Sequence, residues 1–180
     1  MIIGLCGYKG TGKTTVANYL IKEHGFKPVN FKDGLIVELR KNFPLLLSEL
    51  SQTYHMDIPK LFENKPAAMR TLMQEYGTEV RRNDDQEYWI KRWWEGVAGT
   101  RGNIVTDDVR FFNELAALGD KKGILIRVTR DDITTGGEHQ SEKEQEKFIE
   151  DFTIVGQVGS HDAIYKQIDS IIQTIKSNND

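Results

Sequence analysis

The sequence lacks several features that would assign a function class directly. It contains one cysteine, Cys6, so an internal disulfide is excluded, and we expect this residue to be a small apolar side chain of a buried strand. No apolar run is long enough to span a bilayer. The short apolar start leads straight into glycines, so we expect no signal peptide. These absences favour a soluble protein of the reducing cytoplasm.

The charge balance gives no sign of a strongly basic surface. The formal net charge is −3 and the isoelectric point is near 5.9, so we expect no nucleic-acid partner. The four histidines lack the spacing of metal ligands, and we predict no zinc site. A length of 180 residues, with 38% of them hydrophobic, is enough for one domain with a full core. We find no internal repeat, linker or low-complexity segment.

Residues 7–14 carry the most informative motif of the chain. They read G-Y-K-G-T-G-K-T, which fits the phosphate-binding P-loop pattern G-x-x-x-x-G-K-[ST]. An apolar, strand-like run precedes the motif at 2–6, and residues 14–21 have helical spacing. A glycine loop in that context directs backbone N–H groups and a helix N-terminus at phosphate.

The motif therefore predicts a site for a nucleoside triphosphate and Mg²⁺. Lys13 is expected to reach the β- and γ-phosphates and to act in catalysis by spreading their charge, and the Thr14 hydroxyl is expected to help hold the metal ion. The residues predicted to bind the nucleotide are Gly7, Gly10, Thr11, Gly12, Lys13, Thr14 and Thr15.

Short apolar strands alternate with helical segments, which predicts an α/β fold with a five-stranded parallel sheet sandwiched by helices. The strands are expected at about 2–6, 27–31, 103–106, 123–128 and 152–155. The helices are expected at about 14–24, 35–50 with a break at Pro44, 66–80, 84–98, 111–119, 142–150 and 161–176, while 51–65 looks less regular. We interpret the chain as a single domain, 1–180, with a helical insertion at about 35–98 that carries specificity.

Helical periodicity also predicts which side chains are buried. In the helix that Pro66 opens, the inward residues are expected to be Met69, Leu72, Met73, Tyr76 and Val80. In the last helix they are expected to be Ile164, Ile168, Ile171, Ile172 and Ile175. The charged run 142–147 is expected to be a solvated helix face.

Several features favour a small-molecule kinase. Ligands of parallel α/β sheets bind beyond the carboxyl ends of the strands, which predicts one cleft around the P-loop, Asp33, residues 107–110 and Arg130. Arginines, which suit phosphoryl transfer, recur at strand ends and on helix faces: Arg70, Arg81, Arg82, Arg110, Arg127 and Arg130. A polar loop at about 129–142, with Gly136 and Gly137, is expected to be a lid that excludes water. The N-K-x-D motif of GTPases is absent.

Three acidic residues each have two interpretations. Asp107 and Asp108 follow a strand, where one of them could approach Mg²⁺ through water, or could cap the next helix. Asp33 could meet a sugar hydroxyl or an acceptor phosphate, or could cap a helix.

The acceptor-side residues are also open to alternatives. Trp89 lies off the apolar stripe of its helix and could stack on a base. Gln74 could read a base edge or be solvated. On an ideal helix Arg81, not Arg82, shares a face with Arg70 and Gln74, although Gly77 could bend the helix.

Three segments resemble bacteriophage-type deoxynucleoside monophosphate kinases. Residues 69–82, M-R-T-L-M-Q-E-Y-G-T-E-V-R-R, match the family pattern L-x-Q-x-x-G-T-E-x-x-R, which precedes a tryptophan, here in 88–90. Residues 106–114, T-D-D-V-R-F-F-N-E, match its D-D-V-R-F-x-N-E. Residues 139–142, H-Q-S-E, are similar to the family's H-x-S-E after the lid arginine. The resemblance covers nearly the whole chain.

This resemblance implies a P-loop kinase of the nucleoside monophosphate kinase type, with ATP and Mg²⁺ at the P-loop, that converts deoxynucleoside 5′-monophosphates to diphosphates. It implies that Arg110 and Arg130 are catalytic, with Arg130 in the lid, and it selects Arg82 over Arg81. The implied acceptor site consists of Asp33, Arg70, Gln74, Arg82, Trp89, Asp108 and Arg110. The chain departs from the family where Ile36 replaces a lysine and where an asparagine after the last strand is missing.

Two alternative functions stay open on the sequence alone, namely a P-loop kinase of another small metabolite and a nucleotide-binding regulatory ATPase. The sequence does not select the accepted bases, the sugar, or a monomer over a homodimer. If the chain is phage-encoded, its place is the host cytoplasm.

Overall fold

The computed structural model describes residues 1–133, 140–157 and 161–178. The predicted lid residues Gly136, Gly137 and His139 lie outside these ranges. The chain forms two compact units: a sheet unit, made of Met1–Asn30 and Gly96–Asp180, and a helical unit, Phe31–Glu95. Within the described ranges, no helix is both long and apolar enough to cross a membrane.

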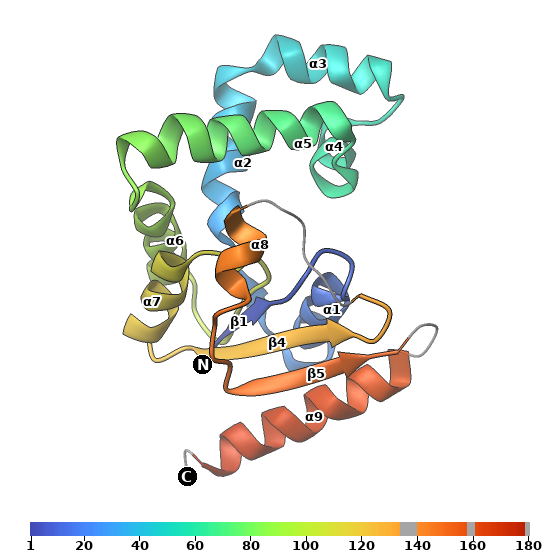
Figure 1. Ribbon diagram of the computed structural model, residues 1–180, viewed down its shortest axis with the longest axis vertical. Helices are drawn as coiled ribbons and strands as arrows, with labels where there is room; N and C mark the ends of the chain where they lie inside the picture. The colour runs from blue at the N-terminus through green and yellow to red at the C-terminus, as the bar shows by residue number, and fades with distance from the viewer. Residues whose placement is uncertain (134–139, 158–160, 179–180) are drawn as a thin grey trace. The chain divides into compact units, whose positions relative to one another are not determined.

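The sheet unit is built on five parallel strands in the order β2-β3-β1-β4-β5. Figure 1 labels three of them, β1, β4 and β5. The strands are β1 (Ile2–Cys6), β2 (Lys27–Pro28), β3 (Ile104–Thr106), β4 (Ile124–Arg130) and β5 (Phe152–Gly156). The predicted α/β fold with a five-stranded parallel sheet flanked by helices is confirmed. β1 lies at the centre of the sheet, so the loop that follows it is at the middle of the carboxyl edge.

The helices of the sheet unit follow the predicted order. They are α1 (Lys13–His24), α7 (Phe112–Asp120), α8 (Gln140–Gln145) and α9 (His161–Ser177). α8 is shorter than predicted, because the chain leaves the helix after Gln145. β2 is also shorter than predicted, because the chain has already turned into the next helix at Phe31.

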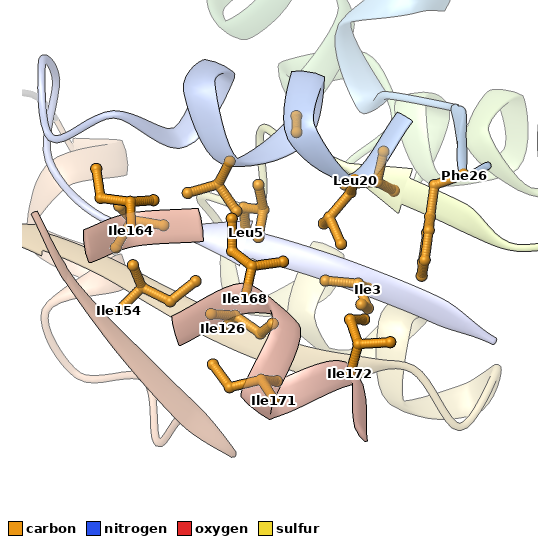
Figure 2. Packing of buried hydrophobic residues seen from close by; sticks show 14 of the residues in the cluster. Ile3, Leu5, Leu20, Phe26, Ile126, Ile154, Ile164, Ile168, Ile171 and Ile172 are labelled. Atoms are coloured by element: carbon orange, nitrogen blue, oxygen red, sulfur yellow. The ribbon is translucent and has the colours of Figure 1, made fainter. Parts of the chain in front are cut away.

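Strand alternation places Ile3 and Leu5 on one face of β1, where they meet α1 and α9 (Figure 2). All five isoleucines predicted to face inward from α9 are buried in this cluster, which confirms the helical periodicity. Cys6 is buried at the end of β1, also as predicted. Gly4 points to the other face, where a Cβ atom would lie 2.5 Å from the Leu118 Cδ2 of α7. Helices therefore cover both faces of the sheet.

The helical unit has its own core. Its elements are α2 (Phe31–Asn42), α3 (Pro44–Thr53), α4 (Ile58–Asn64), α5 (Ala67–Gln74), the π-helix η1 (Glu75–Arg82) and the start of α6 (Tyr88–Gly99). The predicted break at Pro44 is confirmed. The expectation of irregular structure at 51–65 is wrong in its second half, because Asp57 caps α4 by accepting the Lys60 N–H and Pro59 occupies the first turn, where it is tolerated.

The π-helix changes which side chains face the core after Gln74. Met69 and Tyr76 are buried as predicted, but Val80 is 46% exposed, so its predicted burial is wrong. In a π-helix each backbone hydrogen bond spans five residues instead of four, so side chains beyond the transition move away from their α-helical positions. A prediction based on a period of 3.6 fails after that point.

Two isoleucine substitutions test the packing of the sheet unit. Ile168→Ala, at a position with 1% exposure, should lower the free energy of unfolding by about 2–5 kcal/mol, because it leaves a cavity between α9 and the sheet. The control Ile149→Ala, at a position with 91% exposure, should change it by less than about 0.5 kcal/mol. Urea unfolding followed by circular dichroism measures both; equal losses would contradict the assigned core.

Candidate nucleotide-binding site

The loop between β1 and α1 has the backbone conformation that a P-loop needs. Gly7, Gly10 and Gly12 have φ values of 132°, 87° and 106°, which residues with a Cβ rarely adopt. Gly12 directly precedes α1, so the loop ends at a helix N-terminus, where partial positive charge favours an anion. The predicted strand, glycine loop and helix are all present.

Gly7 and Gly12 differ in how closely neighbouring atoms approach them. A Cβ atom on Gly7 would lie 2.1 Å from the carbonyl oxygen of Val128 in β4, so the first loop residue packs directly against the neighbouring strand. A Cβ atom on Gly12 would meet no atom within 4 Å. The start of the loop is therefore held tightly by the sheet, while no neighbouring atom crowds the Cβ direction of Gly12.

The side chains of the loop are engaged with its backbone. The Lys13 Nζ donates hydrogen bonds to the carbonyl oxygens of Gly7, at 2.5 Å, and Tyr8, at 2.8 Å. The buried Thr11 Oγ1 donates to the Tyr8 carbonyl at 3.0 Å. Thr14 is exposed in the first turn of α1 and Thr15 is half-buried. The Lys13 ammonium thus lies at the loop, and the Thr14 hydroxyl is accessible at the helix N-terminus.

A cavity of about 330 Å³ lies against the start of the loop. It is lined by Gly7, Tyr8, Arg127, Val128, Thr129, Ile133 and Glu146. Its walls come from the loop, from the carboxyl end of β4 and from the segment after α8.

The C-terminal end of α8 is fastened to the same loop. The Gln145 Oε1 accepts the Gly7 N–H at 3.1 Å, and the Tyr8 hydroxyl donates to the Glu146 carboxylate at 3.0 Å. The expectation that 142–147 forms only a solvated face is therefore wrong at Gln145, which is 1% exposed. The signal in the sequence was that Gln145 is the one uncharged residue of this run.

Arg127 has a structural role in this arrangement. Its guanidinium bonds to the Glu150 carboxylate at 2.8 Å and to the carbonyl oxygens of Gln145 and Phe148. Burial acts to raise the pKa of Glu150, but the hydrogen bond and charge of Arg127, together with hydrogen bonds from backbone and from Thr153, hold that pKa below its ordinary value. Arg130, at the end of β4, forms a bidentate pair with Asp132 at 2.5 and 3.1 Å.

The segment after β3 is held by buried polar groups. The Asp107 N–H donates to the Asn30 Oδ1 at 2.8 Å, and Asp108 is buried. The Glu114 carboxylate accepts the N–H groups of Arg110, at 2.7 Å, and Phe111, at 3.1 Å. Phe111 is the N-cap residue of α7, so the capping role considered for the two aspartates does not apply to that helix.

In the helical unit, the π-helix brings Arg81 into a polar network. Arg81 donates to the Glu38 carboxylate at 3.0 Å and to the Tyr76 hydroxyl at 2.8 Å, and its guanidinium lies over the rings of Tyr76 and Tyr88. The Tyr88 and Tyr76 hydroxyls also donate to Glu38. The guanidinium of Arg81 is therefore part of the internal structure of the helical unit.

The other predicted acceptor residues also lie in this unit. Asp33 is exposed in the first turn of α2, and Gln74 is exposed at the end of α5. The Arg70 Nη2 donates to the Lys65 carbonyl at 3.2 Å. Trp89 is 3% exposed and its indole Nε1 donates to the Gly77 carbonyl at 2.8 Å, which leaves almost no ring surface for a base. We therefore assign Trp89 to the core of the unit.

The predicted residues thus fall into two groups. The sheet unit brings together the loop residues with Lys13 and Thr14, and it also holds Asp107, Asp108, Arg110 and Arg130. The helical unit holds Asp33, Arg70, Gln74, Arg82 and Trp89. The single cleft that the sequence predicts for both groups stays a prediction.

The parallel sheet, with a glycine loop between its central strand and α1, defines a P-loop protein of the α/β class. The model of the deoxynucleotide monophosphate kinase family matches residues 47–168, which is more than half of the chain. The chain therefore belongs to the deoxynucleotide monophosphate kinase family, and it is a phosphotransferase. The matched range begins after the P-loop, so the loop geometry is a separate argument for the same class.

The known proteins similar to this chain include a viral relative and a bacterial protein of known structure. A protein of Acanthamoeba polyphaga mimivirus with the name "Putative deoxynucleotide monophosphate kinase" is 29% identical over 160 residues, which cover 80% of this chain and 81% of that protein. The crystal structure of TT1252 from Thermus thermophilus superposes with a TM-score of 0.55 at 14% identity, covering 97% of both chains, and this likeness concerns the fold alone.

The Glu38 network predicts a pH-dependent stability. Burial acts to raise the pKa of Glu38, but hydrogen bonds from Tyr88 and Tyr76 together with Arg81 hold it below its ordinary value. A lowered folded-state pKa means that the contribution is complete above the unfolded-state pKa and is lost as the pH falls through the folded-state pKa. Glu38→Gln should therefore cost on the order of 1–2 kcal/mol at neutral pH and much less in acid.

Urea unfolding at pH about 7 and about 3 measures this difference. Glu49→Gln, which replaces an exposed carboxylate of α3 in the same unit, is the matched control and should have little effect at either pH. A cost of Glu38→Gln that is the same at both pH values would contradict the assigned network.

Proposed function

We propose that this chain transfers the γ-phosphoryl group of ATP to deoxynucleoside 5′-monophosphates, which yields ADP and deoxynucleoside diphosphates. The observation that carries the proposal is the conformation of the glycine loop with the Lys13 ammonium at its start, in a chain of the deoxynucleotide monophosphate kinase family. If the chain is virus-encoded, as its mimivirus relative is, the reaction takes place in the host cytoplasm.

The residues of the loop fit a triphosphate and its metal ion. The glycine loop can direct its N–H groups at phosphate oxygens, and Lys13 can exchange its loop carbonyls for the β- and γ-phosphates. Among the described residues, no group of three or more His, Cys, Asp or Glu side chains is placed to hold a metal ion. The residues that would hold Mg²⁺ beside the phosphates are Thr14, through its hydroxyl, and Asp107 or Asp108, through water. When bound, it neutralises charge on the phosphates.

The proposed reaction is an in-line displacement. An oxygen of the acceptor's phosphate forms a bond to the γ-phosphorus, the bond from that phosphorus to the β–γ bridging oxygen breaks, and ADP leaves with the electron pair. Lys13, Arg110 and Arg130 stabilise the charge on the transferred group. Arg130 can do so only after it exchanges its present partner, Asp132, for phosphate.

We place the monophosphate acceptor at Asp33, Arg70, Gln74, Arg82, Asp108 and Arg110, and we leave out Trp89 because of its burial. All of these except Asp33 lie within the residues that the family model matches. Arg82, which the resemblance to the family selects over Arg81, is the arginine that we propose for the acceptor's phosphate.

Lys13→Met tests the nucleotide half of the proposal. It should reduce the turnover number by at least about 10²-fold, because the charge on the transferred phosphoryl group loses a fixed cation. Lys9→Met, an exposed lysine of the same loop, is the control and should keep its activity. Coupled ADP release with dAMP, dGMP, dCMP and dTMP measures both and reports the accepted bases. Undiminished turnover by Lys13→Met, or ADP release that does not depend on an acceptor, would contradict the proposal.

Arg82→Ala tests the acceptor half. It should raise the KM for the monophosphate by about 10- to 100-fold, because a charge-assisted bond to phosphate is lost, and should leave the KM for ATP nearly unchanged. Arg81→Ala should mainly lower the melting temperature, because Glu38 loses its cation. If both variants kept wild-type kinetics, the assigned acceptor site would be wrong.

A further inference from the structure

Gln145 forms a hydrogen bond with the P-loop although it lies much later in the sequence. It lies at the end of α8 and is 1% exposed, and its Oε1 accepts the N–H of Gly7, a residue 138 positions earlier in the chain. A buried side-chain amide with a defined partner keeps its place, because the loss of that bond leaves a buried polar group unsatisfied. This contact therefore fixes the first residue of the loop.

Gly7 is held on three sides at once. Its N–H donates to Gln145, its carbonyl oxygen accepts from the Lys13 Nζ at 2.5 Å, and its α-carbon packs against the Val128 carbonyl of β4. Gln145 is thus linked to the Lys13 ammonium through Gly7, whose N–H bonds to Gln145 and whose carbonyl oxygen bonds to Lys13. A shift of Gly7 would move the carbonyl that holds Lys13.

Further hydrogen bonds hold Gln145 and the end of α8 against other parts of the sheet unit. Its backbone carbonyl accepts from Arg127 at 3.1 Å, and Arg127 is fixed in turn by Glu150 at 2.8 Å. The neighbouring Glu146 accepts the Tyr8 hydroxyl, so α8 is tied to two successive loop residues. An amide at position 145 supplies an acceptor without adding a second negative charge to that of Glu146 beside the phosphate-binding loop.

We propose that Gln145 is a positioning residue of the nucleotide site: it fixes the orientation of Gly7 and so the start of the phosphate-binding loop. Before a phosphate binds, it also fixes the Lys13 ammonium through the Gly7 carbonyl. The inference rests on the proposed function in that the ligand is the phosphate tail of ATP or ADP. It concerns nucleotide binding and not the acceptor.

The test compares Gln145→Leu with Gln167→Leu in the full chain. Gln167 is a matched control, because its side-chain amide also grips backbone in the same unit, accepting the Val155 N–H at 3.0 Å and donating to the Val155 carbonyl. Affinity for ADP is measured by calorimetry, the KM values for ATP and for the monophosphate by coupled assay, and stability by thermal unfolding.

We expect Gln145→Leu to weaken ADP binding and to raise the KM for ATP by roughly 5- to 20-fold, as the loss of one buried hydrogen bond predicts, with the KM for the monophosphate unchanged. Gln167→Leu should lower the melting temperature and leave ADP affinity unchanged. Wild-type ADP affinity in Gln145→Leu, or an equal loss in Gln167→Leu, would overturn the inference.

If Gln145→Leu fails to fold, Gln145→Asn decides the question. It keeps the amide but is one methylene shorter, so its oxygen no longer reaches the Gly7 N–H and ADP affinity should fall. Unchanged ADP affinity in Gln145→Asn would overturn the inference. A wild-type chain that binds ADP but phosphorylates no deoxynucleoside monophosphate would contradict the proposed function alone. The ADP titrations test the role of Gln145 separately, because they contain no acceptor.

Discussion

The close contact between Gly7 and the Val128 carbonyl is the constraint on which the rest of the site depends. It brings the start of the loop against the neighbouring strand, at a distance that excludes any side chain. The loop can then rise to Gly12 and present N–H groups at the N-terminus of α1. The hydrophobic core beneath, in which Ile3 and Leu5 pack against α1 and α9, holds both the strand and the helix in place. Packing thus determines the position of the loop, and the loop determines the chemistry.

Polar contacts in each unit hold particular residues in place. In the sheet unit, Glu114 takes up the backbone N–H of Arg110, and α8 supplies acceptors to the loop. In the helical unit, Glu38 and two tyrosines engage Arg81. Each of these contacts is made by a predicted ligand residue or by its neighbour in the sequence. Each therefore fixes the local backbone that carries the ligand residue. A phosphotransferase benefits from this order, because phosphoryl transfer needs accurate placement more than covalent chemistry.

The fold was largely predictable from the sequence because its signals are local. The glycine loop, the parallel strands and the isoleucine face of α9 each follow from spacing within one segment. The π-helix was not predictable, because the same letters fit an α-helix, and this error carried over to Val80. The burial of Gln145 and Trp89 was not predicted, for a related reason. Their hydrogen-bond partners lie 138 and 12 residues away in the sequence, and the neighbouring residues do not indicate those partners. Long-range hydrogen bonds decide such roles, and a local pattern does not contain them.

The burial of Cys6 has a practical consequence for chemistry on this protein. Removal from water raises the pKa of its thiol to about 11, so the group stays protonated and unreactive at neutral pH. Since the chain has no second cysteine, one introduced at an exposed position becomes the sole target for a maleimide dye or a spin label. Pairs of such labels, one in each compact unit, would report distances between the two units in solution without any need to remove a native thiol.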